Sequence, residues 1–375
     1  MKLLYILNTT NRVNNFSYSS MIAAQELEIE FHIAGNWTGY SNVSDKRSDE
    51  KKYGIKIHQI DFIRAPYDPR NIKAYRQVVE LIKREKYDMI HCNTPIGGVI
   101  GRLAGKKCGV KKIIYEAHGF HFFKGAPKLN WMIYYPIEKW LAHFTDCIVT
   151  MNAEDNAIAK KFKLRNESVV YNVHGVGIDL SEYEGIGQCR DHKREELGFS
   201  EEDIVLISMG DLIARKNYRV AIEAIAKCNN PKLHYIICGN GEELNNLKQM
   251  TVSLGIAKQV HFLGFRTDIR ELLAASDVFV LTSLQEGLPR STMEAMASGL
   301  PCVASKIRGN VDLIENGKGG FLCNPYNADH FAKAIQSSTV AKRRSFCHNN
   351  LLTIKKFDVK TVIDEMKRIY EEVLK

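Results

Sequence analysis

Hydrophobic residues along the chain follow two alternating spacings. Short runs rich in Ile, Val and Leu are separated by longer stretches in which apolar residues recur every three or four positions. The short runs are predicted strands. In the first half of the chain they lie at residues 3–7, 29–34, 55–60, 88–91, 112–116 and 147–150. In the second half they lie at residues 204–208, 235–238, 260–263, 278–282 and 302–304.

The stretches between these strands are predicted helices. In residues 71–86, apolar side chains at Ile72, Tyr75, Val78 and Ile82 fall on one face of an amphipathic helix. Further helices are predicted around residues 21–27, in a Gly-rich segment before residue 112, and at 218–228, 242–254 and 289–298. Strands that alternate with helices form parallel sheets covered on both faces. The pattern therefore predicts an α/β protein with two doubly wound, Rossmann-like sheets.

A boundary between two domains is predicted near Gly175 and Gly177. These glycines lie between the two periodic regions, and the polar stretch 182–193 follows them. The chain of 375 residues is long enough for two domains. We expect residues 1–176 and 177–357 to form domains that face a cleft, with the ligand at the carboxyl ends of the strands.

Composition excludes several classes of protein. Apolar residues make up 45% and charged residues 25% of the chain, as in ordinary globular proteins. No apolar run is long enough to span a bilayer, and the apolar run at residues 3–7 is too short for a signal peptide. The nine cysteines are scattered and form no C-x-x-C pair. They favour a reducing, cytoplasmic location and argue against a thiolate metal site.

The net charge of +9 is unevenly distributed. Residues 1–175 hold 26 Lys and Arg against 17 Asp and Glu, whereas residues 176–375 hold 26 of each kind. A basic half indicates an anionic partner such as a membrane surface, and a lysine-rich solvated surface explains it equally well. The surplus is dispersed and carries no nucleic-acid-binding motif, so we expect no nucleic acid partner.

The segment E-G-L-P-R-S-T-M-E-A-M-A-S-G-L-P at residues 286–301 follows a predicted strand. Pro289 suits the first position of a helix, and Gly299 with Pro301 suits its end. The amides of Gly287 and Leu288 near a helix N-terminus favour a phosphate, and a carboxylate beside them favours hydroxyl groups. The alternative is a helix start that acidic residues merely stabilise.

Three other loops follow predicted strands and are candidates for ligand binding. G-D-L-I-A-R-K-N carries Arg215 and Lys216, two cations suited to a diphosphate. E-A-H-G-F-H-F-F-K-G carries His118, with His121 and Lys124 as weaker candidates. L-G-F-R-T-D brings Gly264 and Phe265 to a strand end where a nucleotide base can meet the backbone. Each loop has a plainer interpretation, as a solvated turn or, for His118, a buried histidine.

Two of the three tryptophans, Trp131 and Trp140, lie in the stretch N-W-M-I-Y-Y-P-I-E-K-W-L-A-H-F. Several lysines lie near it in sequence. Aromatic residues with lysines are typical of segments at a membrane interface. A helix that buries its aromatic face explains the tryptophans nearly as well.

Together these motifs resemble the family 4 glycosyltransferases, which have the retaining GT-B fold. The pair Glu286 and Glu294 resembles that family's donor signature, and G-D-L-I-A-R-K-N resembles its Gly-x-Leu-x-x-x-Lys-Asn element. H-G-F-H-F-F-K-G-A-P with N-W-M-I-Y-Y-P-I-E-K-W is similar to the subgroup of bacterial capsule and exopolysaccharide assembly. The resemblance implies that the N-terminal domain binds the acceptor and that a final helix, about 358–375, returns to it.

The resemblance also implies roles for individual residues. Lys216, Glu286 and His118 correspond to catalytic positions. The donor-binding positions would be Arg215, Lys216, Gly264, Phe265, Glu286, Gly287, Leu288 and Glu294, with Lys216 on the diphosphate and Glu294 on the ribose. His118, His121 and Lys124 would lie on the acceptor side.

The function implied is transfer of a sugar from a nucleotide sugar, with UDP expected, to a lipid-linked saccharide at the inner face of the plasma membrane. No Asp-x-Asp cluster ends a predicted strand, so we expect no metal and no cofactor. The alternatives are a nucleotide-sugar epimerase or hydrolase on the same scaffold, and a non-catalytic protein that binds sugar or lipid.

Overall fold

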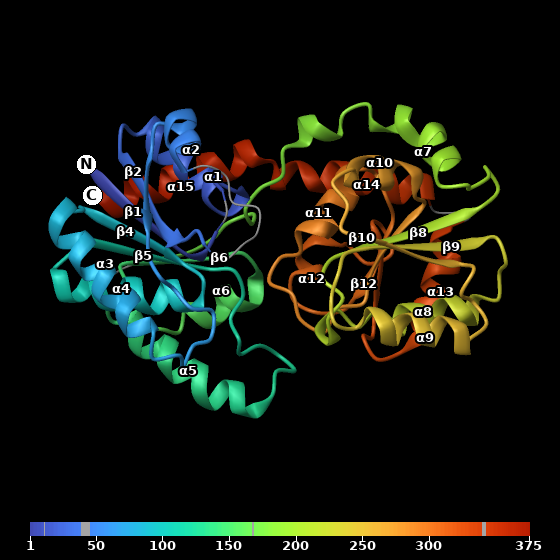
Figure 1. Ribbon diagram of the computed structural model, residues 1–375, viewed down its shortest axis with the longest axis horizontal. Coiled ribbons are helices and arrows are strands. Elements are labelled where there is room, and N and C mark those ends of the chain that lie inside the picture. The colour runs from blue at the N-terminus through green and yellow to red at the C-terminus, as the bar shows by residue number, and fades with distance from the viewer. Residues whose placement is uncertain (11, 39–45, 167–168, 340–342) are drawn as a thin grey trace. The chain divides into compact units, whose positions relative to one another are not determined.

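The computed structural model describes residues 1–10, 12–38, 46–166, 169–339 and 343–375. The chain divides into two compact units, Met1–Gly177 with Val359–Lys375, and Ile178–Asp358. Each unit is built on one parallel sheet with helices on both faces, which confirms the predicted α/β class (Figure 1). The expected final helix belongs to the first unit.

The sheet of the first unit has the strand order β3-β2-β1-β4-β5-β6-β7. Its strands are β1 (Lys2–Thr9), β2 (Glu30–Asn36), β3 (Lys56–Gln59), β4 (Met89–Asn93), β5 (Lys112–Ala117), β6 (Cys147–Thr150) and β7 (Val169–Asn172). Its helices are α1 (Asn15–Glu26), α2 (Lys46–Tyr53), α3 (Asn71–Glu85), α4 (Pro95–Cys108), α5 (Lys128–Ala142), α6 (Ala153–Ala159) and α15 (Val359–Leu374).

Helices α3, α4 and α5 cover one face of this sheet, and α1 and α15 pack together on the other (Figure 1). The Gly-rich helix α4 lies close to the strands because its glycines present no side chain. A Cβ on Gly98 would lie 2.5 Å from the ring of Tyr115, and one on Gly101 would lie 2.7 Å from Cys92. The other face buries Tyr370 of α15, whose side chain is fully enclosed.

The sheet of the second unit has the order β10-β9-β8-β11-β12-β13. Its strands are β8 (Ile204–Met209), β9 (Leu233–Cys238), β10 (Val260–Gly264), β11 (Val278–Leu281), β12 (Cys302–Ser305) and β13 (Gly320–Cys323). Its α-helices are α7 (Arg190–Glu196), α8 (Tyr218–Cys228), α9 (Leu244–Ser253), α10 (Ile269–Ala275), α11 (Arg290–Ala297), α12 (Asn310–Leu313), α13 (Ala328–Thr339) and α14 (Arg343–Ile354). Short 3₁₀ turns are η1 (Leu180–Tyr183), η2 (Ile186–Cys189), η3 (Ala214–Lys216) and η4 (Lys355–Phe357).

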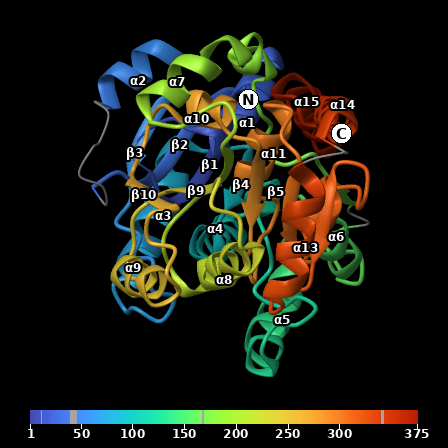
Figure 2. The same ribbon diagram turned by 90° about the vertical axis from the view of Figure 1, so that its right-hand side faces the viewer.

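Two separate apolar clusters lie on the two faces of this second sheet. One gathers residues of α8, α9 and α13, and the other gathers residues of α10 and α11. Figure 2 shows α8 and α9 on one side of β9 and β10, with α10 on the other side. The chain passes between the units at two neighbouring points, since Ile178 donates to the carbonyl of Phe357 at 2.9 Å and Gly177 lies against Val359.

Two edge strands, β7 and β13, were not predicted from the sequence. In β7 the first and last residues, Val169 and Asn172, are exposed, so the strand carries no run of buried positions. In β13 the strand begins at Gly320, where a Cβ would lie 1.8 Å from the carbonyl oxygen of Cys302. Pro289 was also placed wrongly, because α11 begins at Arg290 and Pro289 is its N-cap with an extended backbone.

An aspartate stands directly before three central strands and binds the strand beside it. Asp88 precedes β4 and accepts from the backbone N–H of Lys2 at 3.0 Å. Asp146 precedes β6 and accepts from Ile113 at 2.7 Å, and Asp277 precedes β11 and accepts from Val205 at 2.7 Å. These donors lie at the first or second residue of the neighbouring strand, so each carboxylate secures the amino edge of a strand pair.

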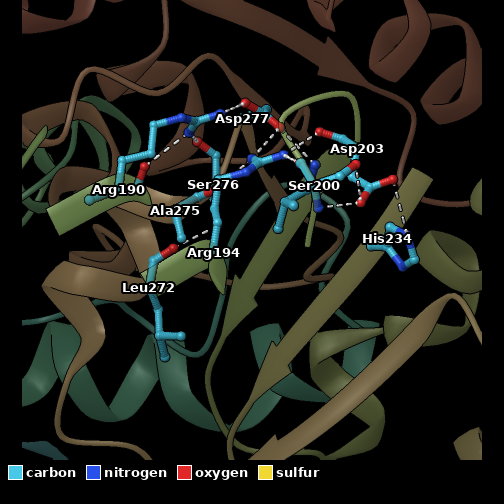
Figure 3. Close-up of polar contacts among 11 residues, drawn as sticks. Arg190, Arg194, Ser200, Asp203, His234, Leu272, Ala275, Ser276 and Asp277 are labelled. Carbon is cyan, nitrogen blue, oxygen red and sulfur yellow. Dashed lines mark hydrogen bonds and ion pairs between the residues drawn. The ribbon is translucent and has the colours of Figure 1, made fainter. Parts of the chain in front are cut away.

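Asp277 also holds α7 against the sheet of the second unit (Figure 3). Its Oδ1 lies 2.6 Å from Arg190 and its Oδ2 lies 3.4 Å from Arg194, both on α7. Arg194 is buried and donates to the carbonyls of Ala275 at 2.9 Å and Ser200 at 2.6 Å. A single carboxylate therefore ties α7 and the start of β11 to β8.

We predict that Asp277→Ala destabilises the protein by about 3–5 kcal/mol, because it leaves Arg194 buried without its counter-charge and the N–H of Val205 without its acceptor. Urea unfolding measures the loss, and Asp277→Asn should lose less because an amide oxygen still accepts. Glu202→Gln is the control, since Glu202 pairs with Lys232 at the surface. An unfolding midpoint for Asp277→Ala that matches the control would contradict this account.

Candidate functional site

Lys216 and Glu286 form an ion pair at the carboxyl edge of the second sheet. Lys216 ends η3, in the loop after β8, and Glu286 lies in the loop after β11, the strand paired with β8. The Nζ of Lys216 lies 2.7 Å from Oε1 of Glu286, and the two side chains are only 13% and 11% exposed. The structure thus brings together two residues that the sequence places 70 positions apart.

Arg215 adds a second cation beside this pair. Its guanidinium lies 3.7 Å from Glu286 and donates to the carbonyl of Gln285 at 2.5 Å. The Arg215 side chain is more exposed than that of Lys216. Arg215 therefore fastens the loop that carries Glu286, while Lys216 forms the shorter contact with the carboxylate.

The floor beneath Lys216 is made of backbone. Gly210 and Gly239 follow β8 and β9 with φ values of +141° and +147°. A Cβ on Gly239 would lie 2.0 Å from the carbonyl oxygen of Gly210, so only glycine fits there. A Cβ on Gly210 would lie 3.3 Å from Cε of Lys216, which places the lysine stem directly over this glycine.

The loop of Glu286 rests on the turn that follows β12. Arg308 is buried and its Nε donates to the carbonyl of Glu286 at 3.0 Å. A Cβ on Gly309 would lie 2.4 Å from the carbonyl oxygen of Gly287. Arg308 was not among the predicted site residues, because nothing in its sequence neighbourhood shows that β12 ends beside β11.

Glu294 lies one turn into α11, closer to the helix start than the sequence segment indicated. Its Oε1 accepts from Nε of Arg290 at 2.8 Å, one turn earlier in the same helix. Burial, and then the charge of Glu294, raise the pKa of the Tyr183 hydroxyl. Arg290 and Glu294 are four residues apart, a spacing from which this ion pair can be predicted in a helix.

Gly264 and Phe265 end β10 as predicted, but they differ in their surroundings. The carbonyl of Gly264 accepts from the N–H of Gly239 at 2.7 Å, so this oxygen is already engaged in the fold. The Phe265 ring is 77% exposed. It therefore offers an open aromatic face beside the glycine floor.

In the first unit, His118 follows β5 at the carboxyl edge of the sheet. Its Nε2 lies 2.6 Å from Oδ1 of Asn93, and its Nδ1 lies 3.1 Å from Sδ of Met151. The ring of Phe16 meets it edge-on, with centroids 4.9 Å apart. Burial lowers the pKa of His118, so the ring is neutral near pH 7 and carries its proton on Nε2, the nitrogen that faces the amide oxygen.

His121 and the backbone of Lys124 contact neighbouring helices of the first unit. The ring of His121 packs on Tyr134 of α5, with centroids 4.9 Å apart, and its carbonyl accepts from Asn130. The backbone N–H of Lys124 donates to Glu154 of α6 at 2.5 Å. These contacts anchor the loop after His118, whereas Asn93, Met151 and Phe16, which surround the imidazole, were not predicted.

Two family profiles match the chain. Residues 190–340 match the family described as glycosyl transferases group 1, and residues 40–152 match glycosyl transferase 4-like. The putative glycosyltransferase EpsD of Bacillus subtilis (strain 168) is 35% identical over 348 residues, which cover 91% of this chain and 88% of EpsD. The chain belongs to glycosyltransferase family 4.

Other relatives of this family 4 glycosyltransferase agree with the assignment. The UDP-Gal:alpha-D-GlcNAc-diphosphoundecaprenol alpha-1,3-galactosyltransferase of Escherichia coli is 31% identical, over 81% of this chain and 80% of its own. The solved structure of Anabaena HepE in complex with UDP and glucose superposes with a TM-score of 0.80 at 22% identity, covering 99% of this chain and 100% of HepE. That similarity confirms the expected GT-B fold.

Within the described ranges of this glycosyltransferase, no three His, Cys, Asp or Glu side chains gather as ligands for a metal ion. None of the helices in the part of the chain that the structure describes is both long and apolar enough to cross a membrane.

Proposed function

We propose that this glycosyltransferase transfers a hexose from a UDP-sugar to a lipid-linked saccharide, with retention of anomeric configuration, in bacterial surface polysaccharide assembly. The observation that carries the proposal is the Lys216–Glu286 pair over the glycine floor. The Escherichia coli relative supports both substrates by its printed name, which contains a UDP-sugar and a diphosphoundecaprenol acceptor. A Campylobacter jejuni relative, 24% identical, also acts on a diphospho-undecaprenol saccharide.

The leaving group of such a reaction is the nucleoside diphosphate. When the bond between the anomeric carbon and the diphosphate oxygen breaks, that oxygen keeps the electron pair and becomes more negative. Lys216 supplies a compact positive charge at a mostly buried position, where it is less screened than in water. Arg215 adds a second positive charge beside Lys216. The two cations would stabilise the leaving group without a metal ion.

Carboxylates of the second unit would bind the hydroxyl groups of the donor. Glu286 accepts from sugar hydroxyls once the diphosphate takes over Lys216, and Glu294 accepts from those of the ribose. The exposed ring of Phe265 stacks on the base. His118 positions the acceptor or the transferred sugar, and the acceptor hydroxyl attacks the face that the diphosphate leaves while its proton passes to the departing phosphate oxygen.

An epimerase or a hydrolase would use the same nucleotide site differently. Either enzyme would act in the absence of an acceptor, and a non-catalytic protein would bind the nucleotide sugar unchanged. The exposed apolar surface of α5 in the first unit, described below, favours a transferase whose acceptor carries a lipid.

A panel of nucleotide sugars tests this proposal. We expect free UDP to appear from one UDP-sugar only when a lipid-linked saccharide is present, and the rate to survive EDTA because Lys216 supplies the positive charge. Release without acceptor would indicate the hydrolase, and a loss that Mg²⁺ restores would overturn the metal-free mechanism.

We predict that Lys216→Ala lowers kcat by a factor of about ten to a thousand, or about 1.4–4 kcal/mol of leaving-group stabilisation. Arg215→Ala should cost less, because Arg215 is more exposed and lies 3.7 Å from Glu286. Lys227→Ala is the control, since this lysine pairs with Asp329 on the surface of α8. Steady-state rates measure the effect, and full activity in a folded Lys216→Ala protein would refute the assignment.

We also infer that the first unit attaches reversibly to an anionic membrane through α5. On the inner side of this helix, Glu138 pairs with the buried Arg102 at 2.8 Å, and Arg102 stacks on Tyr115 with its guanidinium carbon 3.8 Å from the ring centre. Because a buried ion pair is demanding in geometry, this contact fixes which side of α5 faces outward.

The outward side of α5 is apolar. Met132 is 73% and Trp140 is 52% exposed, and both lie on the same stripe of the helix as the exposed Leu129. Lys128 and Lys139 flank the stripe and are exposed as well. A helix with exposed Trp and Met between lysines suits the boundary of an anionic bilayer, where each cation contributes about 1 kcal/mol.

Vesicle flotation tests this attachment. We expect binding to vesicles that contain phosphatidylglycerol at low salt, weaker binding as salt rises, and weaker binding of Trp140→Ala and Met132→Glu. Val252→Glu is the control, because Val252 is an equally exposed apolar residue on α9 of the second unit. If the protein stays unbound at low salt, or the control weakens binding as much, the inference is wrong.

A further inference from the structure

A carboxylate is buried two residues before His118. Glu116 lies near the end of β5 and its side chain is 5% exposed. His118 follows the strand, and its ring meets Phe16 of α1, whose carbonyl accepts from the Tyr5 hydroxyl beside Glu116. Glu116 and His118 therefore lie on the same face of the sheet, at its carboxyl edge. A buried carboxylate needs compensating partners, and the reaction proposed above does not account for this one.

The partners of Glu116 form a chain that ends in the last helix. Nε2 of His91 lies 3.0 Å from Oε2 of Glu116, and the hydroxyl of Tyr5 lies 3.5 Å from the same oxygen. Nδ1 of His91 lies 2.8 Å from the hydroxyl of Tyr370 on α15. His91, Tyr5 and Tyr370 are fully buried.

The carboxylate of Glu116 determines where the protons of the other groups in this network lie. Burial opposes ionisation of Glu116, but its interaction with the His118 ring and its contacts with His91 and Tyr5 hold the pKa of this carboxyl below its usual range. The carboxylate can only accept, so His91 presents its Nε2–H to Glu116. Nδ1 of His91 then accepts the O–H of Tyr370, which fixes the tautomer of the ring.

We propose that Glu116 is a positioning residue for His118: its negative charge counters the burial of the imidazole, and Tyr370 of the last helix holds this charge in place through His91. Nε2 of His118 is committed to Asn93, so Nδ1, beside Met151, is the atom that takes up a proton. The titratable groups that act on His118 are Glu116 and His91, and Tyr5 and Tyr370 act through Glu116. The inference rests on the proposed function only for its catalytic consequence.

The primary test is the titration of His118 in the full chain without substrate, followed by NMR of labelled histidines and assigned with His118→Gln. Glu116→Gln removes the negative charge, so we expect the midpoint of His118 to fall by about one pH unit or more. Tyr370→Phe removes the partner of Nδ1 of His91 and so loosens the ring that holds Glu116, and we expect it to move the His118 midpoint in the same direction by less. An unchanged His118 midpoint in a folded Glu116→Gln protein would overturn the proposal.

The variant Tyr171→Phe distinguishes a role of Tyr370 in positioning His118 from a role in simply holding α15 against the sheet. Tyr171 on β7 also places its hydroxyl on α15, at Glu372, so this variant removes a comparable contact without touching Glu116. We expect Tyr370→Phe, and not Tyr171→Phe, to lower kcat several-fold with little change in KM and to displace its pH profile. If both variants change activity alike, the network only docks the helix. The titration of His118 needs no turnover. It can therefore be measured and interpreted even if the proposed reaction is wrong.

Discussion

Backbone packed directly against backbone is the constraint on which the candidate site of the second unit depends. The turns after β8 and β9 meet at Gly210 and Gly239, and the turns after β11 and β12 meet at Gly287 and Gly309, at distances that exclude a Cβ. Lys216 passes over the first contact, and the loop of Glu286 rests on the second. A side chain at either contact would displace one of the two loops that the ion pair joins.

The two sheets share a topology but carry different chemistry at their carboxyl edges. At the edge of the second unit, Lys216 and Arg215 lie beside the carboxylate of Glu286, and Arg308 donates to the backbone carbonyl of the same residue. In the first unit, His118 is surrounded by the amide of Asn93, the thioether of Met151 and the ring of Phe16. Glu116 lies two residues earlier, on β5. A hollow lined by lysines does exist in the first unit, but it lies at the amino edge, beside Asp88. Under the proposed function, the edge of the second sheet suits an anionic diphosphate, and the edge of the first sheet suits neutral hydroxyl groups.

Sequence periodicity predicted the elements that are buried on both sides, and strand β6 and helix α8 agree residue for residue. It predicted the edge strands β3 and β10 but missed the edge strands β7 and β13, whose four-residue sequences V-V-Y-N and G-F-L-C are too short to show a period. Residues that follow strands within recognisable motifs, such as Lys216 and Glu286, could be predicted. Arg308 and Tyr370 could not, because their positions depend on which strands and helices become neighbours; Tyr370 and His91 are 279 residues apart.

The ion pair between Lys216 and Glu286 also has a consequence for selectivity under the proposed function. A diphosphate that binds Lys216 must take the lysine from Glu286, whose carboxylate is only 11% exposed and then lacks its nearest counter-charge. A poorly solvated carboxylate without a partner is costly, and hydroxyl donors from a correctly placed sugar remove that cost. The pair thus couples the two halves of the donor: a nucleoside diphosphate alone leaves the carboxylate unsatisfied, whereas the intact nucleotide sugar satisfies both residues at once.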